Sequence, residues 1–306
     1  MRFKLKTTKL QDYKKIIKME RNKFFDAPFD LAYKNFVNLG YDKKTRRFFK
    51  ENASEIVENL RSSCWKDFLN TEKKFNIKMF NVLINQKYAN SLFPNEAITN
   101  FLNEYSDYIY ELILSNTQSR RSRAGKEFES IIELLLMGAE IKFESQGILT
   151  IDRFTKKEMG KMIDLVLPGV IEFNIDKTNI IIISAKTTLR ERWQEVVEEM
   201  SRTGAKEIIL ATLDEKINEK LFTFLSEKNI KIATTKKIKE DKYKNNSIVL
   251  TFEDLIKRGL RNMEKWKNYK FNSDKKELIK NLYIKQIEKH RDHKFVVDFY
   301  KDKLNE

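Results

Sequence analysis

Residues 163–169 read IDLVLPG and residues 179–186 read NIIIISAK, two aliphatic runs joined by a Pro-Gly turn and a short polar loop. Runs of this length, rich in β-branched residues and bounded by turn residues, are typical of buried strands. Further along the chain, the pattern predicts helices and strands in alternation, at 190–201 (helix), 207–211 (strand), 215–227 (helix), 231–233 (strand) and 248–251 (strand). This alternation predicts an α/β fold with a mixed sheet flanked by helices.

The chain before these strands has a different pattern. Apolar residues recur at helical spacing from Leu10 to about residue 115, which predicts an all-helical N-terminal region. A polar stretch at 115–119 marks the expected boundary, so we expect a helical domain at 1–115 and an α/β domain at 116–306 with a helical C-terminal tail. The α/β domain is expected to open with a helix at 124–137 that Gly138 terminates.

Composition limits the classes of function. The 306 residues contain 60 Lys and Arg against 45 Asp and Glu, a formal charge of +15, which favours a polyanionic partner such as nucleic acid, although general solubility would also explain it. Cys64 is the single cysteine and there are two histidines, which excludes an internal disulfide and most zinc sites. With no apolar run of membrane-spanning length and no secretory signal in the sequence, we expect a cytoplasmic protein.

Three charged residues of the α/β region form a candidate nuclease site. Asp164 interrupts an apolar strand, Lys186 ends the next strand, and Glu199 lies in the helix that follows. If the two strands pair, a carboxylate and an ammonium group meet at one end of the sheet, an arrangement suited to holding a divalent metal ion and a phosphate. Taken singly, Asp164 could be a strand-end cap and Lys186 a solvated strand terminus.

A candidate DNA-reading segment follows Lys186. Thr188 and Glu191 have the spacing of a capping box, which places Arg190 and Arg192 in the first helical turn. Arginine reads guanine with two hydrogen bonds, and a glutamate accepts one from the cytosine amino group, so the segment suits a target containing G·C pairs. An ordinary charged helix face would have the same composition.

The order of these motifs resembles the PD-(D/E)XK type II restriction endonucleases, in their EcoRII and NgoMIV branch. The resemblance covers about residues 119–249 and rests on three segments, SRRSRAGKEFE (119–129), ID (163–164) and SAKTTLRERWQ (184–194). It implies a mixed sheet flanked by helices and Mg²⁺-dependent hydrolysis of duplex DNA that leaves 5′-phosphates.

The resemblance also assigns residues. It implies that Asp164 and Lys186 are catalytic and that Glu199, displaced onto the helix, replaces the usual acid at the position of Ser184. Asp164 and Glu199 would ligate the metal, and Glu129 would support the site, a role for which Glu127 is the weaker candidate. The residue before Asp164 is isoleucine where the family commonly has proline.

The family's K-x3-R-(D/E)-R element is similar to Lys186 followed by Arg190, Glu191 and Arg192. It implies recognition of a palindrome built on CCGG, or on CC and GG around a central base pair. Arg123 is a further DNA-recognition candidate. Cutting both strands of a symmetric site requires two active sites, so we expect a homodimer or a larger even oligomer, together with a cognate DNA methyltransferase. The arrangement of a helical region ahead of the nuclease domain is similar to that of family members that recognise CCGG with A/T flanks.

Two other functions remain open on the sequence alone. A structure-selective repair or junction nuclease would share the fold, and a non-enzymatic DNA-binding protein would share the charge. The pair His290 and His293 is interpreted as surface residues on a charged helix. The lysine-rich run at 236–244 is interpreted as a solvated loop, with phosphate contact as the alternative.

Overall fold

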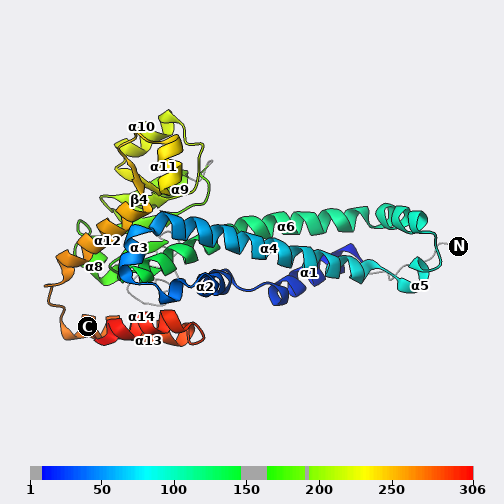
Figure 1. The fold of residues 1–306 in the computed structure, drawn as a ribbon, viewed down its shortest axis with the longest axis horizontal. Helices are drawn as coiled ribbons and strands as arrows, with labels where there is room; N and C mark the ends of the chain where they lie inside the picture. Colours follow the sequence, from blue (N-terminus) through cyan, green and yellow to red (C-terminus); the bar gives the residue numbers. More distant parts are fainter. Residues whose placement is uncertain (1–8, 146–163, 190–192, 306) are drawn as a thin grey trace. The chain divides into compact units, whose positions relative to one another are not determined.

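The structure is a computed structural model that describes residues 9–145, 164–189 and 193–305 (Figure 1). The chain forms two compact units. Unit 1 comprises Met1–Leu31 and Ser62–Lys126, and unit 2 comprises Ala32–Arg61 and Glu127–Glu306. The division therefore differs from the expected boundary near residue 115. That position lies inside α6 (Pro94–Gly138), beyond its kink at Tyr105, because Thr117 and Gln118 are exposed there and the buried Asn116 accepts a hydrogen bond from the Arg21 guanidinium.

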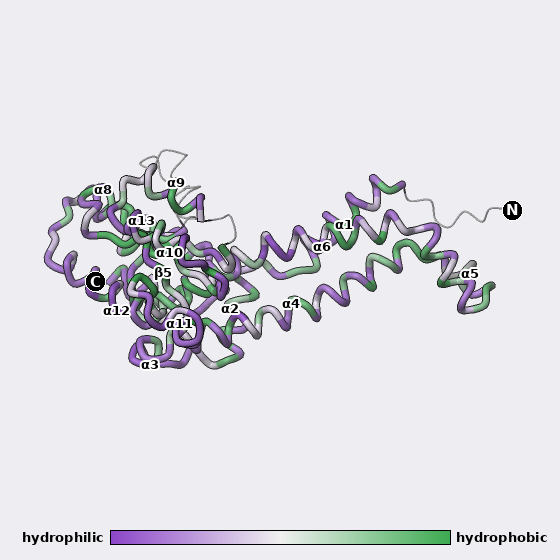
Figure 2. Tube along the Cα trace, turned by 90° about the horizontal axis from the view of Figure 1, so that it is seen from above, coloured by the Kyte–Doolittle hydropathy of each residue, from purple (hydrophilic) through white to green (hydrophobic). Residues whose placement is uncertain are grey.

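Unit 1 is helical, as predicted. It contains α1 (Leu10–Phe24), α5 (Gln86–Ala89), the start of α2 (Pro28–Asn38) and large parts of α4 (Ala53–Leu83) and α6. Hydrophilic and hydrophobic residues alternate along α4 and α6 (Figure 2), as expected of amphipathic helices. Its core includes a cluster of aromatic rings, Phe24, Phe25, Phe68 and Phe75. None of the described helices carries an apolar stretch long enough to cross a membrane.

Unit 2 is built on one mixed sheet. Its strands are β1 (Glu144–Ser145), β2 (Leu165–Leu167), β3 (Ile181–Ala185), β4 (Ile208–Ala211), β5 (Ile230–Thr234) and β6 (Val249–Thr251), and this chain order is also their order in the sheet. β1, β2 and β3 pair antiparallel, whereas β3 to β6 pair parallel. The predicted mixed sheet is therefore confirmed, and the carboxyl ends of β3 to β6 lie at one edge.

Successive side chains of each strand point to opposite faces of the sheet. On one face, Ile182, Ile208 and Ile232 pack with side chains from α9 (Trp193–Thr203) and α10 (Glu219–Glu227). Towards the other face lies α12 (Phe252–Trp266), on which a Cβ at Gly259 would contact Leu167 of β2. Helices therefore cover the buried strands, as near-continuous apolar runs require.

Several elements were not predicted. These are α8 (Val170–Ile175), α11 (Lys236–Lys242) and α12, while η1 (Tyr41–Lys43) and α3 (Arg46–Glu51) lie in the region expected to be helical. Helices α13 (Ser273–Lys289) and α14 (Lys294–Asn305) form the expected helical tail. The run at 236–244 was interpreted as a loop, but most of it is helix α11. Thr235 caps this helix by accepting a hydrogen bond from Ile238 N, and lysine is a good helix former.

The interpretation of Gly138 had the wrong reason, and the surface location expected for His290 was wrong. Helix α6 does end at Gly138, but the residue with the left-handed backbone is Glu140 (φ 58°). A Cβ at Gly138 would overlap the ring of Phe49, so the glycine permits close packing. His290, expected at the surface, is buried in the turn between α13 and α14, and burial lowers its pKa to about 3.

Candidate active site

Asp164 and Lys186 meet at one edge of the sheet. Asp164 immediately precedes β2, and Lys186 immediately follows β3. These strands pair antiparallel with Leu165 opposite Ile183, so the start of one strand lies beside the end of the other. The Lys186 Nζ lies 3.0 Å from Asp164 Oδ2, and both side chains are buried. The pairing expected from the strand pattern therefore brings these two charges into direct contact.

The backbone of β3 holds the Asp164 carboxylate in place. Ala185 N donates a hydrogen bond to Asp164 Oδ2 at 2.8 Å, and Ser184 Oγ lies 3.4 Å from the same oxygen. Ser184 thus occupies the usual position of the second acid but acts as a hydrogen-bond donor. Because both donors belong to β3, the strand pairing fixes the orientation of the Asp164 carboxylate before any ligand binds.

Glu199 joins this pair from helix α9. Its Oε1 lies 3.8 Å from Lys186 Nζ, and its Oε2 is buried with no hydrogen-bond partner among the described residues. Burial, with a smaller effect of the nearby Asp164 charge, raises the pKa of Glu199 to about 7, while Lys186 and Ser184 act in the opposite direction. Attraction by one lysine therefore does not compensate for placing two carboxylates in a buried site.

The pair Asp164 and Glu199 has the chemistry of a divalent-metal site. Oxygen ligands are preferred by hard cations, and the unpartnered Oε2 of Glu199 is an acceptor that lacks a donor. A bound cation would satisfy this atom and offset the second negative charge. In the described part of the chain, however, no three acidic, histidine or cysteine side chains are close enough to hold one ion together.

Glu129 is therefore not grouped with the two carboxylates. It is half-buried on α6, two residues from Glu127, and two residues correspond to about 200° around a helix. Glu127 is buried and forms an ion pair with Arg61. The supporting role expected for Glu129 remains a prediction.

The predicted DNA-reading residues Arg190, Glu191 and Arg192 lie outside the described residues, as does the capping partner of Thr188. The residue before them is fixed by a side chain that the sequence analysis missed. Leu189 N donates to Asp214 Oδ2 at 2.7 Å, and Lys216 N donates to Asp214 Oδ1 at 2.9 Å. Asp214 lies three residues beyond β4; an aspartate just after a strand was the available signal.

Arg123 belongs to unit 1, whereas Asp164, Lys186 and Glu199 belong to unit 2. Its guanidinium donates to the carbonyl oxygen of Asp26 and lies over the rings of Phe25 and Phe68, 5.3 and 5.8 Å from their centroids. Through these contacts the Arg123 side chain packs against other residues of unit 1. The DNA-recognition role expected for Arg123 remains a prediction.

Comparisons with known proteins show the family to which the chain belongs. The family model described as EcoRII C terminal matches residues 81–256. The type II restriction enzyme SsoII from Shigella sonnei is 47% identical over 294 residues, which cover 96% of each chain. The chain belongs to this family of type II restriction endonucleases. That membership decides against the repair-nuclease and non-enzymatic alternatives.

Solved structures of restriction endonucleases share the fold. Metal-depleted Ecl18kI in complex with uncleaved DNA is similar, with a TM-score of 0.91 and 45% identity over 98% of this chain and 100% of the other. A complex of PspGI with substrate DNA has a TM-score of 0.56 and 17% identity, with 79% and 94% coverage, which supports the fold alone. The α/β class with a helical N-terminal region is therefore confirmed.

Proposed function

We propose that this restriction endonuclease cleaves duplex DNA in a Mg²⁺-dependent reaction at a short palindromic site. The core of the site is CCGG, or CC and GG around a central base pair. The observation that carries the proposal is the cluster of Asp164, Lys186 and Glu199 at one sheet edge, with Lys186 within 4 Å of both carboxylates. The structure of Ecl18kI in complex with uncleaved DNA supports DNA as the substrate.

Asp164 and Glu199 would hold the metal ion. When bound, Mg²⁺ supplies charge neutralisation at the phosphate and activation of the attacking water. That Ecl18kI was solved metal-depleted with uncleaved DNA supports a divalent-metal requirement for this chain. Glu129 would support the site, the role that the family resemblance implies for it.

Lys186 would act on the reacting phosphate. Its ammonium group donates hydrogen bonds and carries a positive charge, so it can orient the attacking water and stabilise the negative charge that develops on phosphorus-bound oxygens. The water oxygen forms a new bond to phosphorus as the bond to the 3′-oxygen breaks. The products are then a 3′-hydroxyl and a 5′-phosphate.

The segment 190–192 would read the bases. Arg190 and Arg192 would each address a guanine in the major groove, and Glu191 would accept a hydrogen bond from a cytosine amino group. Arg123 would contribute a further DNA contact. A homodimer or larger even oligomer would place one such site on each strand of the palindrome. A cognate methyltransferase would protect the host's own sites.

The test is digestion of a plasmid of known sequence with purified protein and Mg²⁺, followed by sequencing of the fragment ends. The expected result is a set of discrete fragments whose ends share one CC and GG palindrome. The Lys186→Ala variant is the matched control, expected to bind the same duplex without cutting it. A smear of fragments from the wild-type protein would contradict the proposed specificity.

A further inference from the structure

A groove in unit 2 is lined by the two described residues that flank the predicted DNA-reading segment in sequence, Leu189 and Trp193. It has a volume of about 510 Å³ and lies between the start of α9 and the start of α10. Its apolar lining consists of Leu189, Trp193, Ile217, Leu221 and Phe224. The Trp193 and Phe224 rings meet edge to face with centroids 5.1 Å apart, so this surface is formed by packed side chains.

The polar rim of the groove is positively charged. Lys216 and Lys220 are exposed, and neither forms an ion pair with any residue that the structure describes. The single carboxylate of the lining, that of Asp214, accepts backbone hydrogen bonds through both oxygens, from Leu189 and Lys216. The two ammonium groups therefore remain available to an anionic ligand.

The position of the groove connects it with the active site. Leu189 lines the groove and directly precedes Arg190, the first residue of the reading segment. The groove borders the loop after β4, and Lys186 follows β3, the neighbouring parallel strand. Adjacent strands are about 4.8 Å apart, so the groove and the active site share one sheet edge. In open α/β sheets, ligands bind in the crevice outside the carboxyl ends of the strands.

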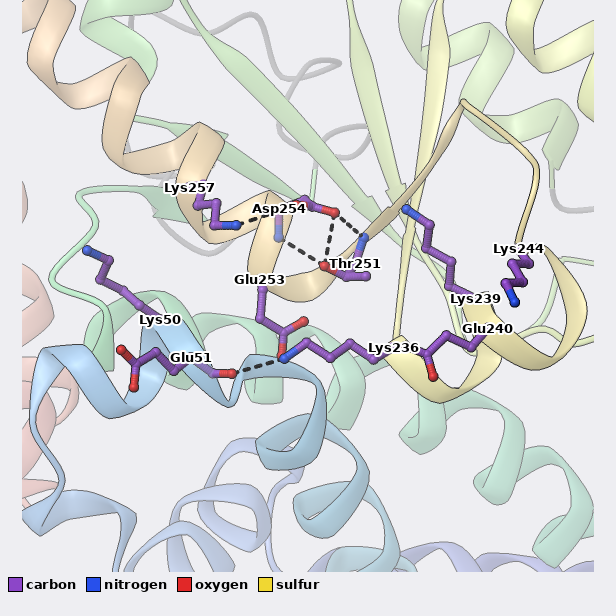
Figure 3. A pocket seen from close by; sticks show the side chains of 10 residues that line it. All are labelled: Lys50, Glu51, Lys236, Lys239, Glu240, Lys244, Thr251, Glu253, Asp254 and Lys257. Atoms are coloured by element: carbon purple, nitrogen blue, oxygen red, sulfur yellow. Dashed lines mark hydrogen bonds and ion pairs between the residues drawn. The ribbon is translucent and has the colours of Figure 1, made fainter.

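A second pocket at the same edge has a different charge pattern. It is lined by residues near the ends of β5 and β6, and its lysines share the space with carboxylates (Figure 3). Lys236 Nζ lies 3.2 Å from Glu253 Oε1 and donates to Glu51 O, and Lys257 faces Asp254 at 4.0 Å. Because it contains charges of both signs, this pocket is the weaker site for a phosphate and a suitable control.

We propose that the groove beside α9 and α10 binds the DNA sugar–phosphate backbone next to the recognised bases. Lys216 and Lys220 contact phosphates, and the apolar lining packs against a deoxyribose. The proposal rests on the proposed function, because it places the backbone beside the segment that reads the bases. Such contacts strengthen binding to all sequences and set the register of the protein on the duplex.

The first test is the salt dependence of DNA binding. Each phosphate contact changes the slope of log K against log salt concentration by about 0.9, so Lys216→Ala/Lys220→Ala is expected to flatten the slope by about 2. The ratio of affinities for specific and non-specific duplexes is expected to stay unchanged. The control Lys239→Ala/Lys244→Ala removes the same charge from the pocket of Figure 3 and is expected to change the slope by less than about half as much. Equal slopes for the two double variants would overturn the proposal.

The second test locates the contact. Duplexes carrying one neutral methylphosphonate at successive positions are bound to wild-type protein and to the double variant. At the contacted phosphates, the substitution is expected to weaken wild-type binding and to have no further effect on the variant, a failure of additivity that marks a direct contact. Additive effects at every position would overturn the proposal. Failure of the proposed function would appear separately, as wild-type protein that prefers no sequence.

Discussion

Replacing Glu199 with glutamine is expected to stabilise the metal-free protein at pH values at which the Glu199 carboxyl would be ionised, and to have little effect at pH 4.5. Burial raises the pKa of Glu199 from an ordinary 4.5 to about 7. A carboxyl whose pKa is higher in the folded than in the unfolded state stabilises the fold when it is protonated. This stabilisation is complete below pH 4.5, the pKa in the unfolded chain, and is lost as the pH rises through 7, the pKa in the folded protein. At pH 8 the ionised group therefore destabilises the fold by about 3 kcal/mol.

The assay is urea unfolding of wild-type protein and Glu199→Gln in EDTA, at pH 4.5 and at pH 8. The free energies of unfolding are expected to be close at pH 4.5 and to differ by about 3 kcal/mol in favour of the variant at pH 8. Glu198→Gln is the control, since Glu198 is exposed on the same helix, and it is expected to change stability by less than about 0.5 kcal/mol. A wild-type protein that is the more stable of the two at pH 8 would refute the reasoning.

Three further outcomes follow from the contacts. Lys186→Ala is expected to lower the cleavage rate at least about a thousandfold while DNA binding persists, as measured by single-turnover cleavage and gel shift; an unchanged rate would remove Lys186 from the mechanism. Gly138→Ala is expected to destabilise the protein by about 1–3 kcal/mol in denaturant unfolding, because the new methyl group overlaps Phe49; a neutral effect would show that the ring moves freely. Asp214→Ala is expected to lower the ratio of cleavage at the cognate site to cleavage at sites with one changed base pair, because Leu189 loses its hydrogen bond; an unchanged ratio would limit Asp214 to a local role.

The sheet and the centre of the active site were predictable because they depend on local patterns. Buried parallel strands are typically continuous apolar runs, and the sequence shows these at 180–183 and 208–211. A charged residue at the end of such a run is conspicuous, and pairing of the strands is sufficient to bring Asp164 to Lys186. Glu199 was a candidate from its place on the helix after Lys186, and the resemblance assigned it the role of the displaced acid. Its burial with an unpartnered oxygen became visible only in the structure.

Other features depend on tertiary contacts that no local pattern encodes. Helix α11 is an exception, because Thr235 caps it through a local hydrogen bond from Ile238 N and was a signal in the sequence. His290 lies in a charged segment and is nonetheless buried where two helices turn. Asp214 acts on Leu189 across 25 residues of sequence, a pairing that spacing rules do not reveal. The domain boundary predicted near residue 115 was also wrong, since α6 continues through that position.

The central claim is that Asp164, Lys186 and Glu199 form one metal-dependent nuclease site. The most direct measurement is the Mg²⁺ dependence of cleavage of a single-site duplex by wild-type protein, Glu199→Gln and Glu198→Gln. The account predicts that EDTA abolishes cleavage by the wild type, that Glu198→Gln matches it at every Mg²⁺ concentration, and that Glu199→Gln cleaves at least about a hundredfold more slowly. A Glu199→Gln protein that cuts at the wild-type rate with the same Mg²⁺ dependence would contradict it.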